Sequence, residues 1–157
     1  MKEVPSASAA PVATATASAT PSIARTAPAA GTGIRLVAGA SDMDALSQIR
    51  TARLEAKAQG RVLVVYVGAS WCDPCKKMKA EIEAGRLDAK LPRITLLAFD
   101  ADKDQERLAT IGYAFKYVPY VALPGADGQP ADSAQATGKG SGAWRDLLVK
   151  LEDWQAR

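Results

Sequence analysis

Hydrophobic and polar positions change their spacing several times along the chain, and each change predicts a secondary-structure element. The short alternating run 34–38 predicts a strand. Ser41 and Asp44 have the spacing of a capping box, which predicts a helix that continues to about Ala58. Residues 61–67 are almost continuously apolar and β-branched, as is typical of a strand buried on both faces of a sheet. We therefore expect 61–67 to be the central strand.

Beyond residue 67, the spacing of apolar positions continues to change between helical and extended segments. The predicted elements are a helix from about Cys72 through Met78, Ile82 and Leu87, a strand at 94–99, a helix from Lys103 to about Phe115, a strand at 120–123, a hairpin turn at 125–128, a short strand at 131–136 and a last helix capped by Ser141. The order of elements is therefore βαβαβαββα. This order predicts an α/β fold with a mixed central β-sheet and helices on both faces.

The first 30 residues differ in composition from the rest of the chain. Of these residues, 23 are Ala, Pro, Ser or Thr, and the prolines among them interrupt any helix. We expect a disordered tether over residues 1–33 and a single folded domain over residues 34–157. Because such tethers often separate a domain from a membrane anchor or a cleaved signal, we expect a targeting segment ahead of Met1. The predicted location is the periplasm or another extracytoplasmic space, with the cytoplasm as the alternative.

The charge and composition of the chain exclude several classes of function. There are 20 Lys and Arg against 17 Asp and Glu residues, interspersed along the chain, so nucleic acid is not an expected partner. No apolar stretch approaches the ~18 residues of a membrane span, and we expect the domain itself to be soluble and monomeric. The chain has no histidine, which excludes Ser-His-Asp and Cys-His catalysis. Cysteine chemistry is the main possibility that remains.

The chain's two cysteines lie in the sequence Trp71-Cys-Asp-Pro-Cys-Lys76, directly after the predicted central strand. If a helix begins near Cys72, the spacing of three residues places both sulfurs on one helical face. They then lie at the helix end where unpaired backbone N–H groups favour a thiolate. The sequence therefore favours a redox-active pair.

Other roles for Cys72 and Cys75 have less support. A disulfide that closes such a short loop stabilises a fold by only about 2 kcal/mol on the chain-entropy model. A structural zinc site normally takes four Cys or His ligands, and a c-type haem attachment needs His where Lys76 stands. An inert buried pair and an intermolecular metal site stay open as alternatives. We expect no bound metal and no cofactor.

These motifs resemble those of the thioredoxin superfamily, specifically the small thioredoxin-like domains of exported thiol-disulfide oxidoreductases. The resemblance covers roughly residues 34 to 156 and rests on the cysteine motif after a buried strand, on Val118-Pro119 at the start of a later strand, and on Gly138 shortly before the last helix. It implies a thioredoxin-like fold and a cis bond before Pro119. It also implies a substrate groove formed by Trp71, Val118, Pro119 and Gly138, in which the Val118 backbone binds an extended segment and residues 137–139 form the third side.

Three positions depart from the superfamily's pattern. The buried Asp six residues before the first Cys is replaced by Tyr66, and the Lys that accompanies this Asp is replaced by Ala98. Tyr66 is expected to be a core or pocket-lining aromatic, with proton transfer through a water as the alternative. The residue after the cis proline is usually small or Thr, and the ring of Tyr120 is expected to narrow the groove.

The resemblance implies a thiol-disulfide exchange mechanism. Cys72 is expected to be the exposed nucleophile that attacks a substrate disulfide, and Cys75 is expected to resolve the mixed disulfide. Lys76 and its neighbour Lys77 favour the Cys72 thiolate, whereas Asp73 opposes it, so the thiolate is stabilised only moderately.

This balance, together with Pro74, favours a disulfide reductase of partner proteins, regenerated by an upstream dithiol reductant. A dithiol oxidase or isomerase is the alternative within the enzyme class. A non-catalytic binding or redox-sensing module is the alternative outside it.

Overall fold

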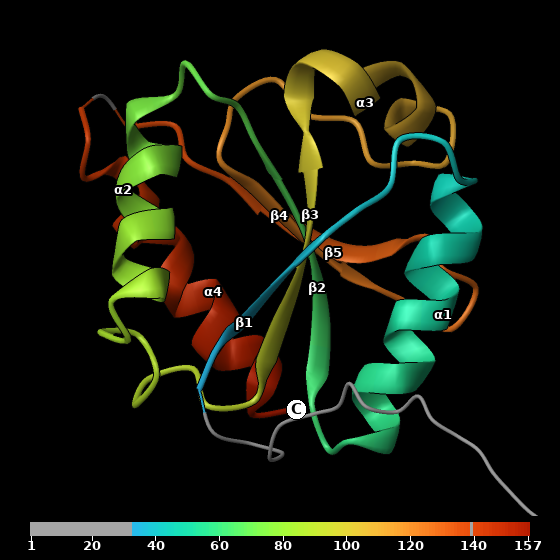
Figure 1. The fold of residues 1–157 in the computed structure, drawn as a ribbon, viewed down its shortest axis with the longest axis horizontal. Coiled ribbons are helices and arrows are strands. Elements are labelled where there is room, and N and C mark those ends of the chain that lie inside the picture. Colours follow the sequence, from blue (N-terminus) through green and yellow to red (C-terminus); the bar gives the residue numbers. More distant parts are fainter. Residues whose placement is uncertain (1–32, 139) are drawn as a thin grey trace, which may run out of the picture.

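The computed structural model describes residues 33–138 and 140–157 (Figure 1). The predicted tether lies outside the described residues, except for Gly33. The elements are β1 (Arg35–Ala38), α1 (Ala45–Ala58), β2 (Val62–Gly68), α2 (Asp73–Glu83), β3 (Ile94–Asp100), α3 (Ala101–Ala109), β4 (Tyr120–Pro124), β5 (Pro130–Gln135), the 3-10 helix η2 (Ala143–Arg145) and α4 (Asp146–Gln155). Their order confirms the predicted βαβαβαββα sequence.

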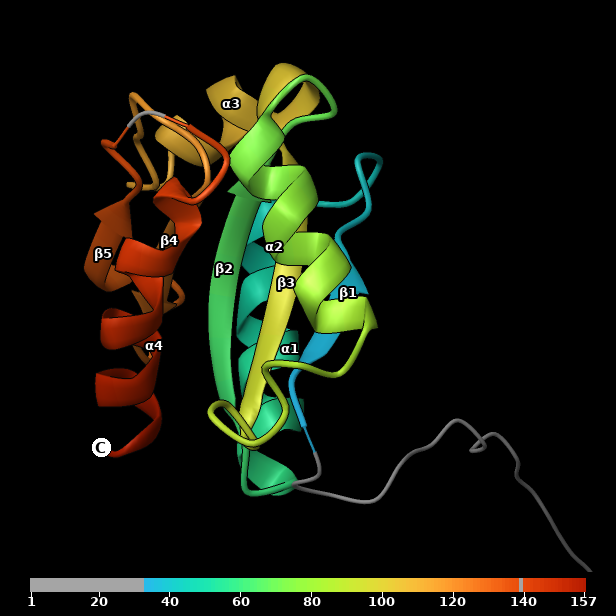
Figure 2. The same cartoon turned by 90° about the vertical axis from the view of Figure 1, so that its left-hand side faces the viewer.

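The five strands form one mixed sheet in the order β1-β3-β2-β4-β5. Strands β1 and β2 pair with β3 in parallel, whereas β4 pairs antiparallel with both β2 and β5. The predicted central strand is therefore confirmed as β2. Helices α2 and α4 cover one face of the sheet, and α1 and α3 cover the other (Figures 1 and 2).

Strand β2 is buried on both faces because its side chains alternate between two hydrophobic clusters. Val64 and Tyr66 pack with residues of α2 and α4, including Met78 and Leu147. Leu63, Val65 and Val67 pack with residues of α1 and α3 on the opposite face. A continuous apolar run is the expected pattern for a strand between two helical layers.

Several helix boundaries differ from the sequence-based prediction. Helix α1 is capped by Asp44, whose carboxylate accepts the Ser47 N–H at 2.8 Å, so the capping box that begins at Ser41 is wrong. Helix α2 ends at Glu83, before Gly85 adopts a φ of 78°. Leu87 is buried beyond the end of α2 and still belongs to the core.

The later helices also differ in their bounds. Helix α3 begins at Ala101 because the Asp100 carboxylate accepts the N–H groups of residues 102 and 103. It ends at Ala109, and Phe115 lies beyond its end. Ser141 does not cap the last helix, which starts as η2 after Gly142 without a side-chain cap. The predicted hairpin turn is confirmed by the N–H of Gly128, which donates to the Gly125 carbonyl at 3.0 Å.

A buried arginine fastens the start of the chain's folded part to the sheet. Arg61 is 4% exposed and donates to the carbonyl oxygens of Gly33 and Ile94, both at 2.6 Å. It also donates to the Thr95 hydroxyl at 2.8 Å. No helix within the described residues is long and apolar enough to cross a membrane.

Candidate redox site

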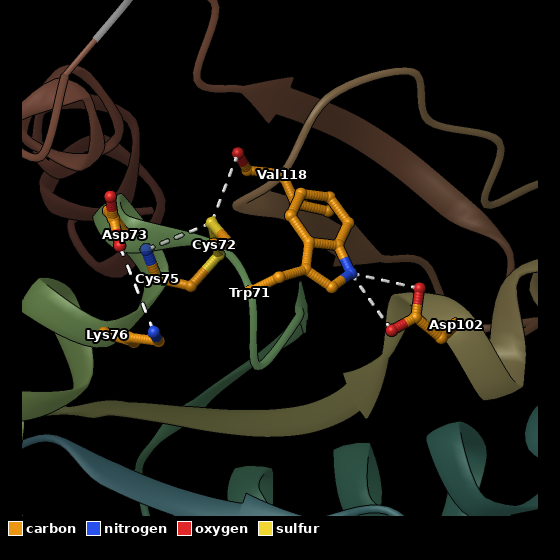
Figure 3. The surroundings of a disulfide bond; sticks show 7 residues. All are labelled: Trp71, Cys72, Asp73, Cys75, Lys76, Asp102 and Val118. Carbon is orange, nitrogen blue, oxygen red and sulfur yellow. Dashed lines mark hydrogen bonds and ion pairs between the residues drawn. A yellow bond between two sulfur atoms is a disulfide. The ribbon is translucent and has the colours of Figure 1, made fainter.

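Cys72 and Cys75 form a disulfide at the N-terminus of α2, where the chain leaves β2 (Figure 3). Their Cα atoms are 5.2 Å apart. Cys72 is the N-cap residue, and its sulfur accepts the Cys75 backbone N–H at 3.2 Å. Pro74 occupies the first turn of α2. Its missing backbone N–H costs no hydrogen bond there, because N–H groups in the first turn have no carbonyl acceptor within the helix. The helix end therefore directs an N–H at the Cys72 sulfur, the atom expected to carry negative charge.

The disulfide is more deeply buried than the sequence indicated. Cys72 and Cys75 are each 4% exposed, so the expectation of an exposed Cys72 is wrong for this oxidised form. The burial follows from the packing of both cysteines in the cluster that also contains Ala69 and Tyr120. Little of either residue is therefore open to an attacking sulfur in this form.

The Val118-Pro119 peptide bond is cis, which confirms the bond geometry expected from the resemblance. The Val118 carbonyl oxygen lies 3.7 Å from the Cys72 sulfur (Figure 3). A disulfide sulfur has no hydrogen to donate, whereas a reduced Cys72 thiol can donate one to this carbonyl. The structure thus brings together Cys72 and the Val118-Pro119 loop, which lie far apart in the sequence.

The loop before Val118 is held in place by a glutamine that the sequence analysis did not single out. The side-chain oxygen of Gln135, at the end of β5, accepts the N–H groups of Lys116 and Tyr117 at 2.9 and 3.0 Å. Because Gln135 is far from this loop in the sequence, no local pattern could have indicated the contact.

Trp71 lies beside the disulfide on the surface. Its side chain is among the most exposed large hydrophobics, at 63%. Its indole N–H is shared between the two carboxylate oxygens of Asp102, at 3.1 and 3.0 Å (Figure 3). Asp102 thus orients the exposed ring next to Cys72.

The charges near the disulfide partly cancel. Lys76 Nζ lies 4.0 Å from Asp73 Oδ1, and both side chains are mostly exposed. Such a pair contributes little to stability. It does offset the positive charge of Lys76. The tuning of a Cys72 thiolate by these charges and by Lys77 stays a prediction.

Tyr66 and Ala98 are directly opposite each other in the β2–β3 pair. Tyr66 is 7% exposed, and this burial raises the pKa of its hydroxyl to about 12. Tyr66 and Cys75 both line a cavity of about 540 Å³ beside the start of α2. Tyr66 is thus a pocket-lining aromatic, one of the roles expected for it.

Two other expected groove residues have different outcomes. Tyr120 is 3% exposed, and its ring packs inward against Phe115 with the ring centroids 5.3 Å apart. The expectation that Tyr120 narrows the groove is therefore wrong. Gly138 lies in an exposed loop between β5 and η2, and its contact with substrate stays a prediction. Lys139 lies outside the described residues.

Within residues 33–138 and 140–157, no group of three or more Cys, Asp or Glu side chains is arranged to hold a metal ion. The chemistry that this arrangement offers is reversible oxidation of the cysteine pair at a helix N-terminus.

Comparison with known proteins agrees with this geometry. A family model described as thioredoxin-like matches residues 44–126, more than half of the chain. The chain belongs to the thioredoxin-like family.

Over 96 residues, the chain is 32% identical to the thiol:disulfide interchange protein DsbD of Vibrio cholerae. The aligned region covers 59% of this chain and 16% of that protein, so the chain corresponds to a small part of its relative.

Solved structures show the same fold at low sequence identity. Thioredoxin f from spinach chloroplast matches with a TM-score of 0.50 and 18% identity, covering 83% of this chain and 100% of that one. A chain of the ferredoxin:thioredoxin reductase and thioredoxin f2 complex matches with a TM-score of 0.52 and 20% identity, covering 78% of this chain and 96% of that one. The mixed sheet with helices on both faces is thus a thioredoxin-like α/β fold.

Proposed function

We propose that this chain is a protein thiol-disulfide oxidoreductase that reduces disulfides in partner proteins. The observation that carries the proposal is the Cys72-Cys75 disulfide at the N-terminus of α2, with the Cys72 sulfur 3.7 Å from the Val118 carbonyl oxygen. This arrangement combines a stabilised sulfur with a backbone acceptor at the point where substrate arrives. Membership of the thioredoxin-like family supports it.

In the reducing direction, the Cys72 thiolate attacks one sulfur of the substrate disulfide, and the other substrate sulfur leaves as a thiolate and takes up a proton. Cys75 then loses its proton and attacks the Cys72 sulfur. The second substrate sulfur leaves, so the substrate gains two electrons and the Cys72-Cys75 pair is oxidised. An upstream dithiol protein regenerates the reduced pair.

Trp71, Val118, Pro119 and Gly138 form the substrate site in this proposal. The Val118 carbonyl accepts a hydrogen bond from an extended substrate segment once the disulfide has opened. The exposed Trp71 ring supplies apolar contact area beside Cys72.

The reducing direction rests on the charges around Cys72. Because Asp73 offsets Lys76, the helix N-terminus alone does not make the thiolate an exceptionally good leaving group. We expect a reduction potential of about −270 to −180 mV, between those of thioredoxin and protein disulfide isomerase.

Turnover of insulin disulfides with dithiothreitol as electron donor tests the activity, and a glutathione titration tests the direction. The reductase is supported by turnover that is lost in Cys72→Ser and by a potential within the expected range. A reduction potential of about −120 mV indicates an oxidase instead. Absence of turnover in the parent chain, with a pair that still cycles with glutathione, indicates a redox-sensing module.

We also propose that residues 1–33 tether the domain in an extracytoplasmic compartment. The composition of this segment supports the proposal. In intact cells that produce the protein with its native N-terminus, a membrane-impermeant thiol reagent should label the reduced pair. Labelling only after lysis of the inner membrane would place the domain in the cytoplasm.

A further inference from the structure

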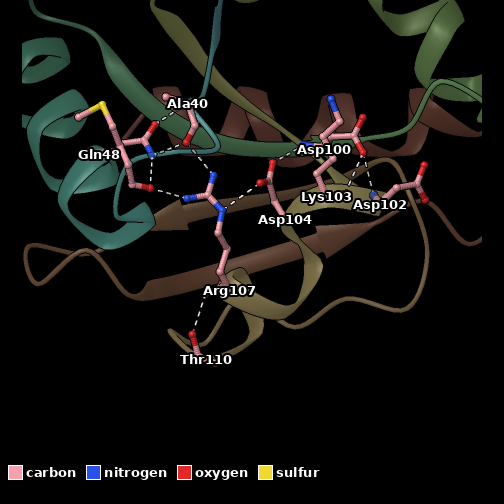
Figure 4. A network of polar contacts seen from close by, with 9 residues as sticks. Ala40, Gln48, Asp100, Asp102, Lys103, Asp104, Arg107 and Thr110 are labelled. Carbon is pink, nitrogen blue, oxygen red and sulfur yellow. Dashed lines mark hydrogen bonds and ion pairs between the residues drawn. The ribbon is translucent and has the colours of Figure 1, made fainter.

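The cavity beside the disulfide and the start of α2 has a volume of about 540 Å³. Cys75 and Tyr66 line it, together with residues at the ends of β1 and β3. One wall is the loop after β1, which contributes Gly39 and Ser41. This wall is fixed by Arg107, which pairs with Asp104 at 2.9 Å and donates to the Ala40 carbonyl at 2.8 Å (Figure 4).

Tyr66 lines this cavity, and its hydroxyl has no hydrogen-bond partner among residues 33–138 and 140–157. Tyr66 is 7% exposed and is held between small residues. Ala98 lies opposite it in β3, and a Cβ atom on Gly68 would come within 2.8 Å of the hydroxyl oxygen. The ring therefore runs along β2 toward the end of the strand that leads to the disulfide.

Packing alone, the role expected from the sequence, explains the Tyr66 ring and leaves its hydroxyl unexplained. A buried polar group without a partner is costly, and ordered water commonly satisfies such groups. The cavity has room for water, and its lining includes further polar side chains, among them Ser70 and Asp100. A water in contact with the Tyr66 hydroxyl therefore has other partners within the same cavity.

Cys75, the residue that must lose a proton, lines the same cavity. Resolution of the mixed disulfide requires Cys75 to become a thiolate, and no histidine exists in the chain to accept its proton. Tyr66 has a raised pKa of about 12, so it stays protonated at neutral pH and does not itself act as the base. It can still accept and donate hydrogen bonds.

We propose that Tyr66 is a positioning residue whose hydroxyl holds a water in this cavity, and that this water receives the Cys75 proton during resolution. The inference rests on the proposed function, because it assigns the proton path of the second step. The proton passes from Cys75 to the water and from there to bulk solvent through the open side of the cavity. The Cys75 electron pair then forms the bond to Cys72 as the bond between Cys72 and substrate breaks.

The test uses Tyr66→Phe, which removes the hydroxyl and keeps the ring. Stopped-flow measurements on the reduced chain with a peptide disulfide should separate attack by Cys72 from resolution by Cys75. We expect attack to stay within about twofold of the parent rate and resolution at pH 7 to slow by about tenfold. The deficit should narrow as the pH rises toward 9, because hydroxide increasingly replaces the positioned water.

Tyr113→Phe is the matched control. The Tyr113 hydroxyl is also buried, but it donates to the Gly128 carbonyl at 2.6 Å and lies outside the cavity lining. Its loss should lower the melting temperature more than the loss of the Tyr66 hydroxyl and should leave both rates unchanged. A second variant, Ala98→Val, adds bulk to the cavity while Tyr66 is retained, and it should also slow resolution selectively.

The outcomes separate the two proposals. If Tyr66→Phe resolves at the parent rate at every pH, the water-positioning role is overturned and the reductase stands. If attack and resolution slow equally, Tyr66 acts through packing and the role is again overturned. If the parent chain forms no mixed disulfide at all, the proposed function itself fails.

Discussion

The hydrogen bond between Trp71 and Asp102 should control how often the exposed indole is in place to receive a substrate. The Trp71 side chain is 63% exposed, and little packing fixes its rotamer. One indole N–H is shared between both Asp102 oxygens at 3.0 and 3.1 Å, so it counts as one charge-assisted bond. At an exposed position, such a bond is worth about 1 kcal/mol. The variant Asp102→Ala removes it.

A loss of about 1 kcal/mol lowers the population of the oriented ring by about fivefold when alternative rotamers compete. We therefore expect kcat/KM for a peptide disulfide to fall about three- to fivefold in Asp102→Ala. Asp102→Asn keeps one oxygen acceptor and should lose less than twofold. Stability should change by less than about 1 kcal/mol in both variants, because Asp102 is exposed in the first turn of α3.

A double-mutant cycle with Trp71→Phe tests the reasoning. Phe has no N–H, so Asp102→Ala should have almost no further effect on kcat/KM in that background. The assay is stopped-flow reduction of a peptide disulfide under pseudo-first-order conditions. An equal fold-loss from Asp102→Ala in the presence and absence of the indole would refute the orienting role and indicate a direct electrostatic effect of Asp102 on the reaction.

Three further predictions concern stability. Arg61→Met should lower the free energy of unfolding, measured in urea, by about 3 kcal/mol, because the buried carbonyls of Gly33 and Ile94 lose a charged donor. The reduction potential should stay unchanged, and a variant as stable as the parent would contradict this prediction. The Trp154 indole N–H and Lys150 hold the pKa of Asp132 below its ordinary 3.8. The parent chain should therefore be more stable than Asp132→Asn at neutral pH, and this difference should disappear as the pH falls below 3.8, because the Asp132 carboxylate becomes protonated. Urea titrations of both proteins at several pH values measure the difference. Deletion of residues 1–32, which keeps the Gly33 carbonyl that accepts from Arg61, should leave insulin turnover unchanged and the melting temperature within about 2 °C, as measured by calorimetry; a larger loss would show that this segment packs on the domain.

Much of the fold follows from local patterns in the sequence. The apolar run that forms β2 and the Cys-x-x-Cys motif after it correctly place the cysteine pair between the central strand and a helix. Element order is predicted well because each strand and helix carries its own periodicity. Helix ends are predicted less well, since they depend on which nearby carboxylate reaches the free N–H groups, as Asp44 and Asp100 do.

The surroundings of the cysteine pair depend on contacts between distant segments. Gln135 holds the loop before Val118 and Asp102 holds Trp71, and neither spacing is a recognisable motif. The burial of Cys72 also results from tertiary packing. The lack of a hydrogen-bond partner for the Tyr66 hydroxyl within the part of the chain that the structure describes is apparent only when β2, β3 and α2 are placed together.

The most direct test of the central claim is to trap the mixed disulfide. Reduced Cys75→Ser should accumulate a covalent adduct with a protein disulfide substrate through Cys72, because attack survives and resolution is lost. Reduced Cys72→Ser should form none, since Cys75 lacks the N-cap position in which a backbone N–H stabilises the Cys72 sulfur. Intact-mass spectrometry after acid quenching measures both. An adduct in Cys75→Ser alone is the predicted result, and equal trapping by both variants, or an adduct through Cys75, would contradict the assigned roles.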